Sequence, residues 1–283
     1  MKRVTILVAF CTLLSGCMYE REDDNPKDTL HKRSPKVKQI ELTTKGVGEP
    51  INTENTTYIF HYENDVLTSY EYDGTATSYW GEWTEHFAGT CEFEYGNDYY
   101  SVIRNVIGNE LCRLTYYPDE GAVKATVGAA LWWKYYYEGE KVVSSSSGIG
   151  QNVDYTWANG NITKVSSPTT GRYMTIQYTN YDYDTSIDYI VEGLWVGLGV
   201  IHTPLVNFAL APLNSGFKTS KLPSSCTMVA NGVAGMWANL SYDFNRDNLV
   251  SKVKIVVTGL YENPDNHYFK GTAWTTNLTI SYY

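Results

Sequence analysis

The feature that most constrains this chain is a hairpin-forming pattern that recurs about every 21 residues. Each copy has a bulky residue, one variable residue and an aromatic, followed by a turn and a hydrophobic return segment. Two strands of about 8 residues with their turns fill such a period, so each copy predicts one β-hairpin. Five consecutive copies, spaced by 21, 21, 20 and 21 residues, begin at Phe93, Leu114, Tyr135, Tyr155 and Ile176. Further copies begin at Phe60 and Tyr242.

The repeat predicts an all-β fold. A lone hairpin is marginally stable in water, so the hairpins must pair into an antiparallel meander and bury a shared face. About a dozen or more strands cannot stay flat, and we expect a strongly curved sheet or a closed, barrel-like one. Because side chains alternate along a strand, the repeated positions should form an inward ladder, as in Phe93/Tyr95, Tyr135/Tyr137 and Tyr155/Trp157. The intervening positions should face water, among them His61, Glu94, Thr156 and Asp243.

Two insertions interrupt the period. The first lies near 73–90 and includes Trp80 and Trp83. The second spans about 185–237, and its centre, 193–217, has no charged residue. Prolines and polar residues make this centre a poor membrane span, so we expect irregular or short-helical chain that packs against, or plugs, the sheet. The prediction is a single β domain over 36–283 with this insertion inside it.

The N-terminus resembles that of a bacterial lipoprotein. Lys2 and Arg3 precede a short apolar run, as in a secretory signal peptide. The run ends in Leu14-Ser15-Gly16-Cys17, which resembles the lipobox, where cleavage precedes a cysteine that is then acylated. We therefore predict a signal peptide over 1–16 and lipidation of Cys17, because several acyl chains on one residue give stable anchoring.

Residues 17–35 are predicted to form an acidic, flexible tether. The cluster Glu20-Arg21-Glu22-Asp23-Asp24 is either a solvated spacer or, as we favour, similar to the export signal of Bacteroides-type surface lipoproteins. Thr29, within Asp28-Thr29-Leu30, resembles an O-glycosylation site of those bacteria. These motifs predict a lipid anchor in the outer membrane, with the protein facing the cell exterior.

The charge and the cysteines exclude several classes of protein. With 22 Lys and Arg against 31 Asp and Glu, the chain has no basic footprint for nucleic acid. Cys91, Cys112 and Cys226 would remain in the mature chain, and they allow one disulfide at most. Ser215 and Lys218 match only the bare SxxK pattern, without its companion elements, and no zinc spacing, GxSxG elbow or P-loop is present. We predict neither a metal nor another cofactor, with looser calcium coordination by Asp182, Asp184 and Asp188 as an alternative to solvated acids. Carboxylate pairs such as Glu92/Glu94 and Glu82/Glu85 keep a hydrolase open as an alternative.

Aromatic residues outside the inward ladder are the candidate binding residues. Tyr is the commonest aromatic, with 25 copies, and most of these residues are needed by the repeat. Trp80 and Trp83 lie in an insertion, while Trp132 and Tyr136 should point outward on one strand. Exposed aromatics are typical of sugar and protein contacts, so we expect a non-catalytic binding module, with glycan as the favoured ligand. The alternative is a structural or accessory subunit that docks another outer-membrane protein through a sheet face or an edge strand.

Taken together, the lipobox, the hairpins with Asn-Asp or Asn-Gly turns, and the segment Ser220-Lys221-Leu222-Pro223-Ser224 after an apolar stretch resemble one family. It is the Bacteroides-type lipoprotein family of unknown function that is described as having a porin-like fold. The hairpin unit is also similar to YD repeats of toxin-shell proteins, although their Tyr-Asp and Gly-Arg consensus is missing. The resemblance implies a curved or barrel-like sheet on a surface lipoprotein, and it implies no activity.

Overall fold

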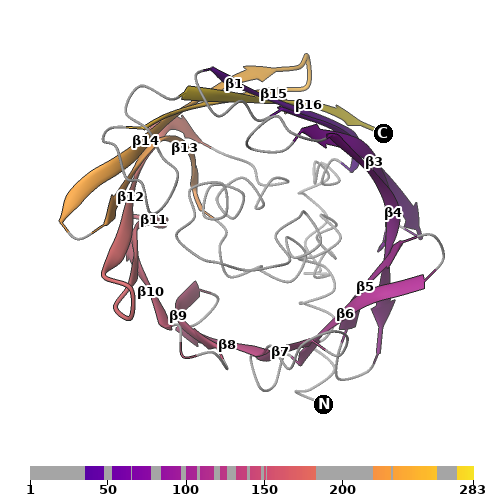
Figure 1. Cartoon of the computed structure of the whole chain (residues 1–283), viewed down its shortest axis with the longest axis horizontal. Coiled ribbons are helices and arrows are strands. Elements are labelled where there is room, and N and C mark those ends of the chain that lie inside the picture. The colour runs from indigo at the N-terminus through magenta and orange to yellow at the C-terminus, as the bar shows by residue number, and fades with distance from the viewer. Residues whose placement is uncertain are drawn as a thin grey trace, which may run out of the picture.

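The described part of the chain is an antiparallel β-barrel (Figure 1). The computed structural model describes residues 36–47, 53–64, 66–77, 84–96, 100–106, 109–117, 122–125, 132–138, 141–147, 150, 152–182, 219–230, 232–259 and 273–283. These residues form sixteen strands: β1 (Val37–Val47), β2 (Thr53–Glu63), β3 (Val66–Thr77), β4 (Thr84–Tyr95), β5 (Tyr100–Val106), β6 (Asn109–Tyr117), β7 (Ala122–Ala125), β8 (Trp132–Glu138), β9 (Lys141–Ser147), β10 (Asn152–Ala158), β11 (Asn161–Ser167), β12 (Arg172–Asp182), β13 (Lys221–Ala230), β14 (Val233–Phe244), β15 (Val250–Gly259) and β16 (Ala273–Tyr282). Within the described ranges, no helix is long and apolar enough to cross a membrane.

The meander closes on itself. Each strand pairs with the next one along the chain, and β1 also pairs with β16, where Ile40 lies opposite Ile280 and Leu42 opposite Leu278. The predicted all-β meander is therefore confirmed, and of the two expected forms, curved or closed, the described strands adopt the closed one. A strand spacing of about 4.8 Å and a tilt of about 40° give such a barrel a diameter of about 30 Å.

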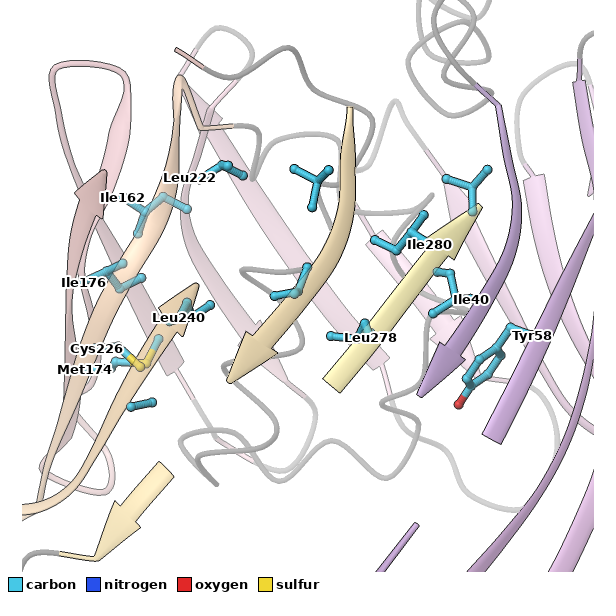
Figure 2. Close-up of a cluster of buried hydrophobic side chains, with 14 of the residues drawn as sticks. Ile40, Tyr58, Ile162, Met174, Ile176, Leu222, Cys226, Leu240, Leu278 and Ile280 are labelled. Carbon is cyan, nitrogen blue, oxygen red and sulfur yellow. The ribbon is translucent and has the colours of Figure 1, made fainter. Parts of the chain in front are cut away.

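The inner face of the wall is apolar. Inward side chains that lie opposite one another on neighbouring strands include Tyr58 and Tyr72, Met174 and Met228, and Val253 and Leu278, and all six are buried. Figure 2 shows part of this lining, with side chains from β1, β2 and β16 and from β11 to β14. On β2, β3 and β4 the lining is aromatic, and the Tyr70 ring lies 5.4 Å from that of Phe60 and 6.2 Å from that of Phe93.

The predicted alternation of faces is confirmed at the described positions of the repeat, except that Phe244 is 37% exposed and His61 is half-buried. Phe93 and Tyr155 are buried, and their partners Tyr95 and Trp157 pack against the same core, as does Tyr137. The positions predicted to face water, Glu94, Thr156 and Asp243, are exposed. The side chain of Tyr135 lies outside the described set. Most of the repeated aromatics therefore belong to the fold.

A β-bulge lies near the turn of several hairpins, and an aromatic side chain of a later strand donates a hydrogen bond into it. The acceptor is always the carbonyl of the residue that pairs just beyond the bulge, on the side of the turn. Among the described residues five such bonds occur, from Tyr95 to Leu67 O (2.7 Å), Trp157 to Val142 O (2.7 Å), Tyr178 to Ile162 O (2.7 Å), Tyr242 to Pro223 O (2.6 Å) and Tyr282 to Val250 O (2.7 Å). Since a bulge leaves ladder groups unpaired, these contacts satisfy a backbone acceptor that would otherwise be orphaned. We call this arrangement the bulge clamp.

A hydroxyl on the extra residue of a bulge satisfies a second carbonyl. Thr163 Oγ1 donates to Thr156 O at 3.3 Å, across the bulge between β10 and β11. Thr68 and Ser251 make the equivalent bonds to His61 O and Asp243 O, at 3.2 Å each. The adjacent tight turns place Asn64, Asn159 and Asn248 at positive φ, as their sequence predicts, because Asn tolerates this conformation.

Both predicted insertion boundaries are wrong in part. Much of the first insertion, near 73–90, is long strand: β3 runs to Thr77 and β4 begins at Thr84. The second insertion was placed at 185–237, but β13 and the first part of β14 occupy 221–230 and 233–237. Pro223 and two serines made β13 look irregular in sequence. The proline is tolerated because it lies opposite Tyr178 at a bulge, where the ladder does not need its missing N–H. The uncharged centre, 193–217, and its predicted packing lie outside the described residues.

Strand direction assigns the connections to two ends of the barrel. One end, which we call the tether rim, carries Lys36 and the connections that follow the even-numbered strands, including the longest one, over 183–220. The other end, the far rim, carries the connections that follow the odd-numbered strands up to β15. Because the chain reaches the barrel at Lys36, the predicted tether over 17–35 would join at the tether rim.

Candidate functional site

The outer face of the wall is polar and charged. Outward positions near the middle of their strands carry Glu41, Glu71, Lys164 and Lys254, all exposed. Histidine and carboxylate side chains approach one another across strands on this face, since His61 Nε2 lies 3.3 Å from Glu71 Oε1, and His86 Nε2 lies 3.3 Å from Asp73 Oδ1. The described wall is therefore apolar inside and polar outside.

Of the four predicted binding aromatics, the structure describes one side chain, that of Tyr136. Tyr136 is 45% exposed on the outer face, as predicted, two residues from the tether rim. Trp132 is the first residue of β8, at the far rim, and its side chain is not described. Trp80 and Trp83 lie outside the described residues, but the flanking residues Thr77 and Thr84 pair with each other at the far rim.

Distance along the wall separates the candidate tryptophans. Four strand steps lie between β4, which Trp83 precedes, and β8, which Trp132 begins. At about 4.8 Å per step in a tilted sheet, these strands are about 20–25 Å apart around the barrel. Tyr136 is displaced from Trp132 toward the opposite end of the same strand. The strand ends next to these tryptophans are thus well separated around the barrel, and whether the side chains meet lies outside what the described residues show.

Sequence reasoning missed a second group of exposed aromatics, at the tether rim. Tyr181 is 59% exposed at the end of β12, and its ring lies 5.6 Å from that of Phe244 at the end of β14. Tyr283 is 68% exposed, and its ring meets that of Tyr62 edge-on at 6.0 Å. The repeat places Phe244 on the inward ladder and its partner Val250 is buried, but at the end of β14 the Phe244 ring is 37% exposed.

Lysines surround the second of these ring pairs. Lys38 Nζ lies 5.8 Å from the ring centroid of Tyr283, and Lys36 Nζ lies 5.6 Å from that of Tyr62. Such distances are within the range of cation–π contacts. Tyr283 is also held by its hydroxyl, which donates to Phe60 O at 2.8 Å. The point where the chain joins the barrel thus combines exposed aromatic rings with basic side chains.

The structure describes three of the four carboxylates that were considered as hydrolytic pairs, namely Glu85, Glu92 and Glu94. Glu92 and Glu94 are exposed on the outer face of β4, as expected of solvated strand residues, and Glu82 lies outside the described residues. Glu54 points inward opposite Thr44, accepts a hydrogen bond from Thr56 Oγ1 at 2.9 Å, and has a pKa raised by burial. No cluster of three or more metal-ligating side chains occurs among the described residues.

Two of the three predicted mature-chain cysteines are placed by the structure. Cys91 on β4 and Cys226 on β13 are buried in the lining, and neither forms a disulfide. Burial raises the pKa of the Cys226 thiol to about 12, which makes it a poor nucleophile. The side chain of Cys112 is not described, and Cys17 and Thr29, the predicted modification sites, lie outside the described residues.

Comparison with solved structures shows the fold. A porin-like protein from Bacteroides uniformis ATCC 8492 matches with a TM-score of 0.57 at 12% identity, over 87% of this chain and 96% of that one. A porin-like protein from Bacteroides vulgatus ATCC 8482 matches at 10% identity with a TM-score of 0.32, over 86% of this chain and 97% of that one. No family model and no curated protein matches the chain. The porin-like fold implied by the resemblance is thus supported.

Proposed function

We propose that this protein is a surface-exposed lipoprotein of the outer membrane, whose barrel lies outside the bilayer as a non-catalytic binding module. The polarity of the wall carries this proposal. A barrel embedded in lipid needs an outward apolar band about 25 Å tall, with polar residues inside. The described strands have the reverse pattern, with Glu41, Lys164 and Lys254 outside and Ile40, Met174 and Val253 inside.

The energetic argument uses the charges near the middle of the strands. A Lys on the lipid face of a barrel costs about 2–4 kcal/mol at the bilayer midplane, and Asp and Glu cost somewhat less. The wall presents exposed Glu41, Glu71, Lys164 and Lys254 from four different strands. The summed cost of placing several such charges in lipid favours a barrel wall that is surrounded by water. A barrel surrounded by water needs another means of membrane attachment, which the acyl groups expected on Cys17 would provide. The polar outer wall therefore supports the proposal that Cys17 is lipidated.

For the ligand we propose glycan, bound at the far rim. The tether would join the barrel at Lys36, on the opposite rim, so the far rim is the end that the anchor leaves free. Trp132 begins β8 at the far rim, and the strands that flank Trp80 and Trp83 end there. Because these positions are about 20–25 Å apart around the wall, an extended polysaccharide suits them better than a single sugar.

Docking to another outer-membrane protein is the alternative, and the closed barrel limits the surfaces through which a partner could bind. Every described strand has a neighbour on both sides, so strand addition at an open edge is not available to these strands. A docking partner would have to contact a sheet face or a rim. We therefore rank docking below glycan binding.

The location is tested by labelling lysines in intact cells with a membrane-impermeant amine reagent, followed by peptide mass analysis. We expect Lys164 and Lys254, both near the middle of outward-facing strands, to react in intact cells as fully as in detergent. Protection of both residues in cells, with reaction only after solubilisation, would contradict a water-exposed wall. Mass analysis of the N-terminal peptide tests acylation of Cys17 in the same sample.

The ligand is tested by affinity electrophoresis in gels that contain polysaccharides. Retention of the protein should fall when Trp80, Trp83 or Trp132 is changed to Ala. Tyr181→Ala is the matched control, because Tyr181 is an exposed aromatic at the end of β12, on the opposite, tether rim. Unchanged retention in all three variants, or an equal loss in the control, would count against a glycan site at the far rim.

A further inference from the structure

The exposed aromatic side chains of the barrel are concentrated at one end. Among the described residues the exposed aromatics are Tyr136, Tyr181, Trp237, Phe244 and Tyr283. All of them except Trp237 lie within two residues of a strand end at the tether rim. They come from β8, β12, β14 and the residue after β16, so they are distributed around the rim and not gathered on one strand.

Basic side chains accompany these rings, but the rim is not basic as a whole. Lys36 and Lys38 lie over the rings of Tyr62 and Tyr283. Among the described side chains within one residue of this rim or in its turns, the basic ones are Lys36, Lys38, Lys141, Lys221 and Arg246, and the acidic ones are Glu63, Glu94, Glu138, Asp243 and Asp247. Among these described side chains the two signs balance, so they supply no long-range attraction to an anionic surface.

Aromatic rings interspersed with charges of both signs match the interfacial layer of a zwitterionic bilayer. Tyr and Trp are enriched at the headgroup level because one part of the ring is apolar and another is polar. Lys and Arg side chains add apolar stems that lie along such a surface while their charged ends stay in water. Balanced charge suits headgroups that carry a positive and a negative charge together.

The chain outside the described residues brings this rim to the membrane. From Cys17 to Lys36 there are 19 residues, which reach at most about 65 Å when fully extended. An acyl anchor at Cys17 thus confines the tether rim to a thin layer above the lipid. In such a layer the effective concentration of a tethered site is high, so a weak contact is enough to seat the barrel.

We propose that the tether rim is a membrane-contact surface, on which Tyr181, Phe244, Tyr283 and Tyr136 rest at the headgroup level of a zwitterionic phospholipid bilayer. The proposal rests on the anchoring at Cys17 that is proposed above. It orients the barrel with its axis along the membrane normal and its far rim pointing away from the lipid. The contact is a second, non-covalent attachment beside the acyl chains.

The test uses the full, lipidated protein in phosphatidylcholine vesicles that contain a nitroxide-labelled phosphatidylcholine. A fluorophore is attached either to Asp247→Cys, in a turn of the tether rim, or to Val233→Cys, exposed at the far rim. Both variants carry Cys112→Ser, while buried Cys91 and Cys226 stay in place. We expect the nitroxide to quench the label at 247 at least threefold more than the label at 233.

Substitution of the rings completes the test. Tyr181→Ser together with Phe244→Ser should abolish the difference between the two labels, whereas Trp237→Ser, on the outer wall, should preserve it. Equal quenching of both labels in protein that floats with the vesicles would overturn the rim contact and leave the anchor intact. Protein that does not float would overturn the anchoring at Cys17 instead.

Two further measurements distinguish contact with zwitterionic lipid from contact with anionic lipid or with a protein partner. Addition of phosphatidylglycerol to the vesicles should not strengthen the quenching at 247, and a severalfold gain would overturn the assignment to zwitterionic lipid. A label at 247 that is shielded from water in native outer membranes, yet not quenched in pure lipid vesicles, would assign the rim to a protein partner and overturn the proposal.

Discussion

The bulge clamp predicts a specific stability cost when one hydroxyl is removed. Tyr178 donates to Ile162 O at 2.7 Å, and Ile162 is fully buried. Burial raises the pKa of the Tyr178 hydroxyl well above its ordinary value, as expected of a group shielded from water. The substitution Tyr178→Phe keeps the ring and removes only the donor, so it isolates the contribution of this bond.

The size of the expected stability loss follows from the Ile162 carbonyl, which Tyr178→Phe leaves without this hydrogen-bond donor. A buried acceptor without a partner costs about 1–3 kcal/mol, and we expect Tyr178→Phe to lower the free energy of unfolding by about 2 kcal/mol. For a domain of this size that loss lowers the Tm by about 4–8 °C. The assay is urea unfolding followed by tryptophan fluorescence, together with a thermal scan by circular dichroism.

Tyr173→Phe on the same strand is the matched control. The Tyr173 ring is on the outer face, where Lys164 Nζ lies 4.6 Å from its centroid, and Phe retains that contact. We expect a change below about 0.5 kcal/mol for this surface substitution. Tyr95→Phe, in a distant hairpin, should add to Tyr178→Phe, because the two bonds share no partner. Equal stabilities of Tyr178→Phe and Tyr173→Phe would refute the reasoning.

Three other predictions follow from single buried groups. Burial raises the pKa of Glu54 above 4.5, so the native protein should lose stability as the pH rises from that value through the folded pKa. Glu54→Gln should flatten the dependence of the unfolding free energy on pH. Parallel pH curves for the variant and the parent protein would contradict this. Gly74→Ala should cost about 1–3 kcal/mol in urea unfolding, because its Cβ would meet Thr56 Oγ1 at 2.6 Å and Asn55 O at 2.8 Å; an unaffected midpoint would argue against this crowding. Cys226, with a thiol pKa of about 12, should react with a disulfide reagent at pH 8 roughly a thousandfold slower in native protein than in urea, and comparable rates would show that the thiol is accessible.

The repeat predicts the faces of the sheet but not its closure. Alternation along Phe93-Glu94-Tyr95 is a local property, and it placed each side chain on the correct face. The closing pair β1 and β16 joins residues such as Ile40 and Ile280, which are far apart in the sequence. Each of these strands also pairs with its neighbour in the sequence, and a local pattern predicts only that neighbouring pair. It therefore does not predict that the first strand pairs with the last.

The candidate binding residues were predicted less well than the fold. Tyr136 was placed outward correctly from alternation alone. The exposed pair Tyr181 and Phe244 was missed, because alternation predicts the face of a side chain but not how much of a ring stays uncovered at the end of a strand. The bulges themselves do have a sequence signal, which is a spacing of three between buried residues at the start of a return strand, such as Val250 and Val253.

That spacing explains how the sequence sets the polarity of the whole wall. A slip of one residue in a hairpin would exchange its two faces, turning Glu and Lys inward. At each clamped bulge two buried residues are three positions apart, because the strand carries one extra residue between them, and both therefore face inward. These pairs are Leu67 and Tyr70, Val142 and Ser145, Ile162 and Val165, Pro223 and Cys226, and Val250 and Val253. The clamping aromatic reaches the carbonyl of the first member, so it is satisfied in one register only. The aromatics of the repeat therefore line the barrel and also hold the register that keeps its charges in water.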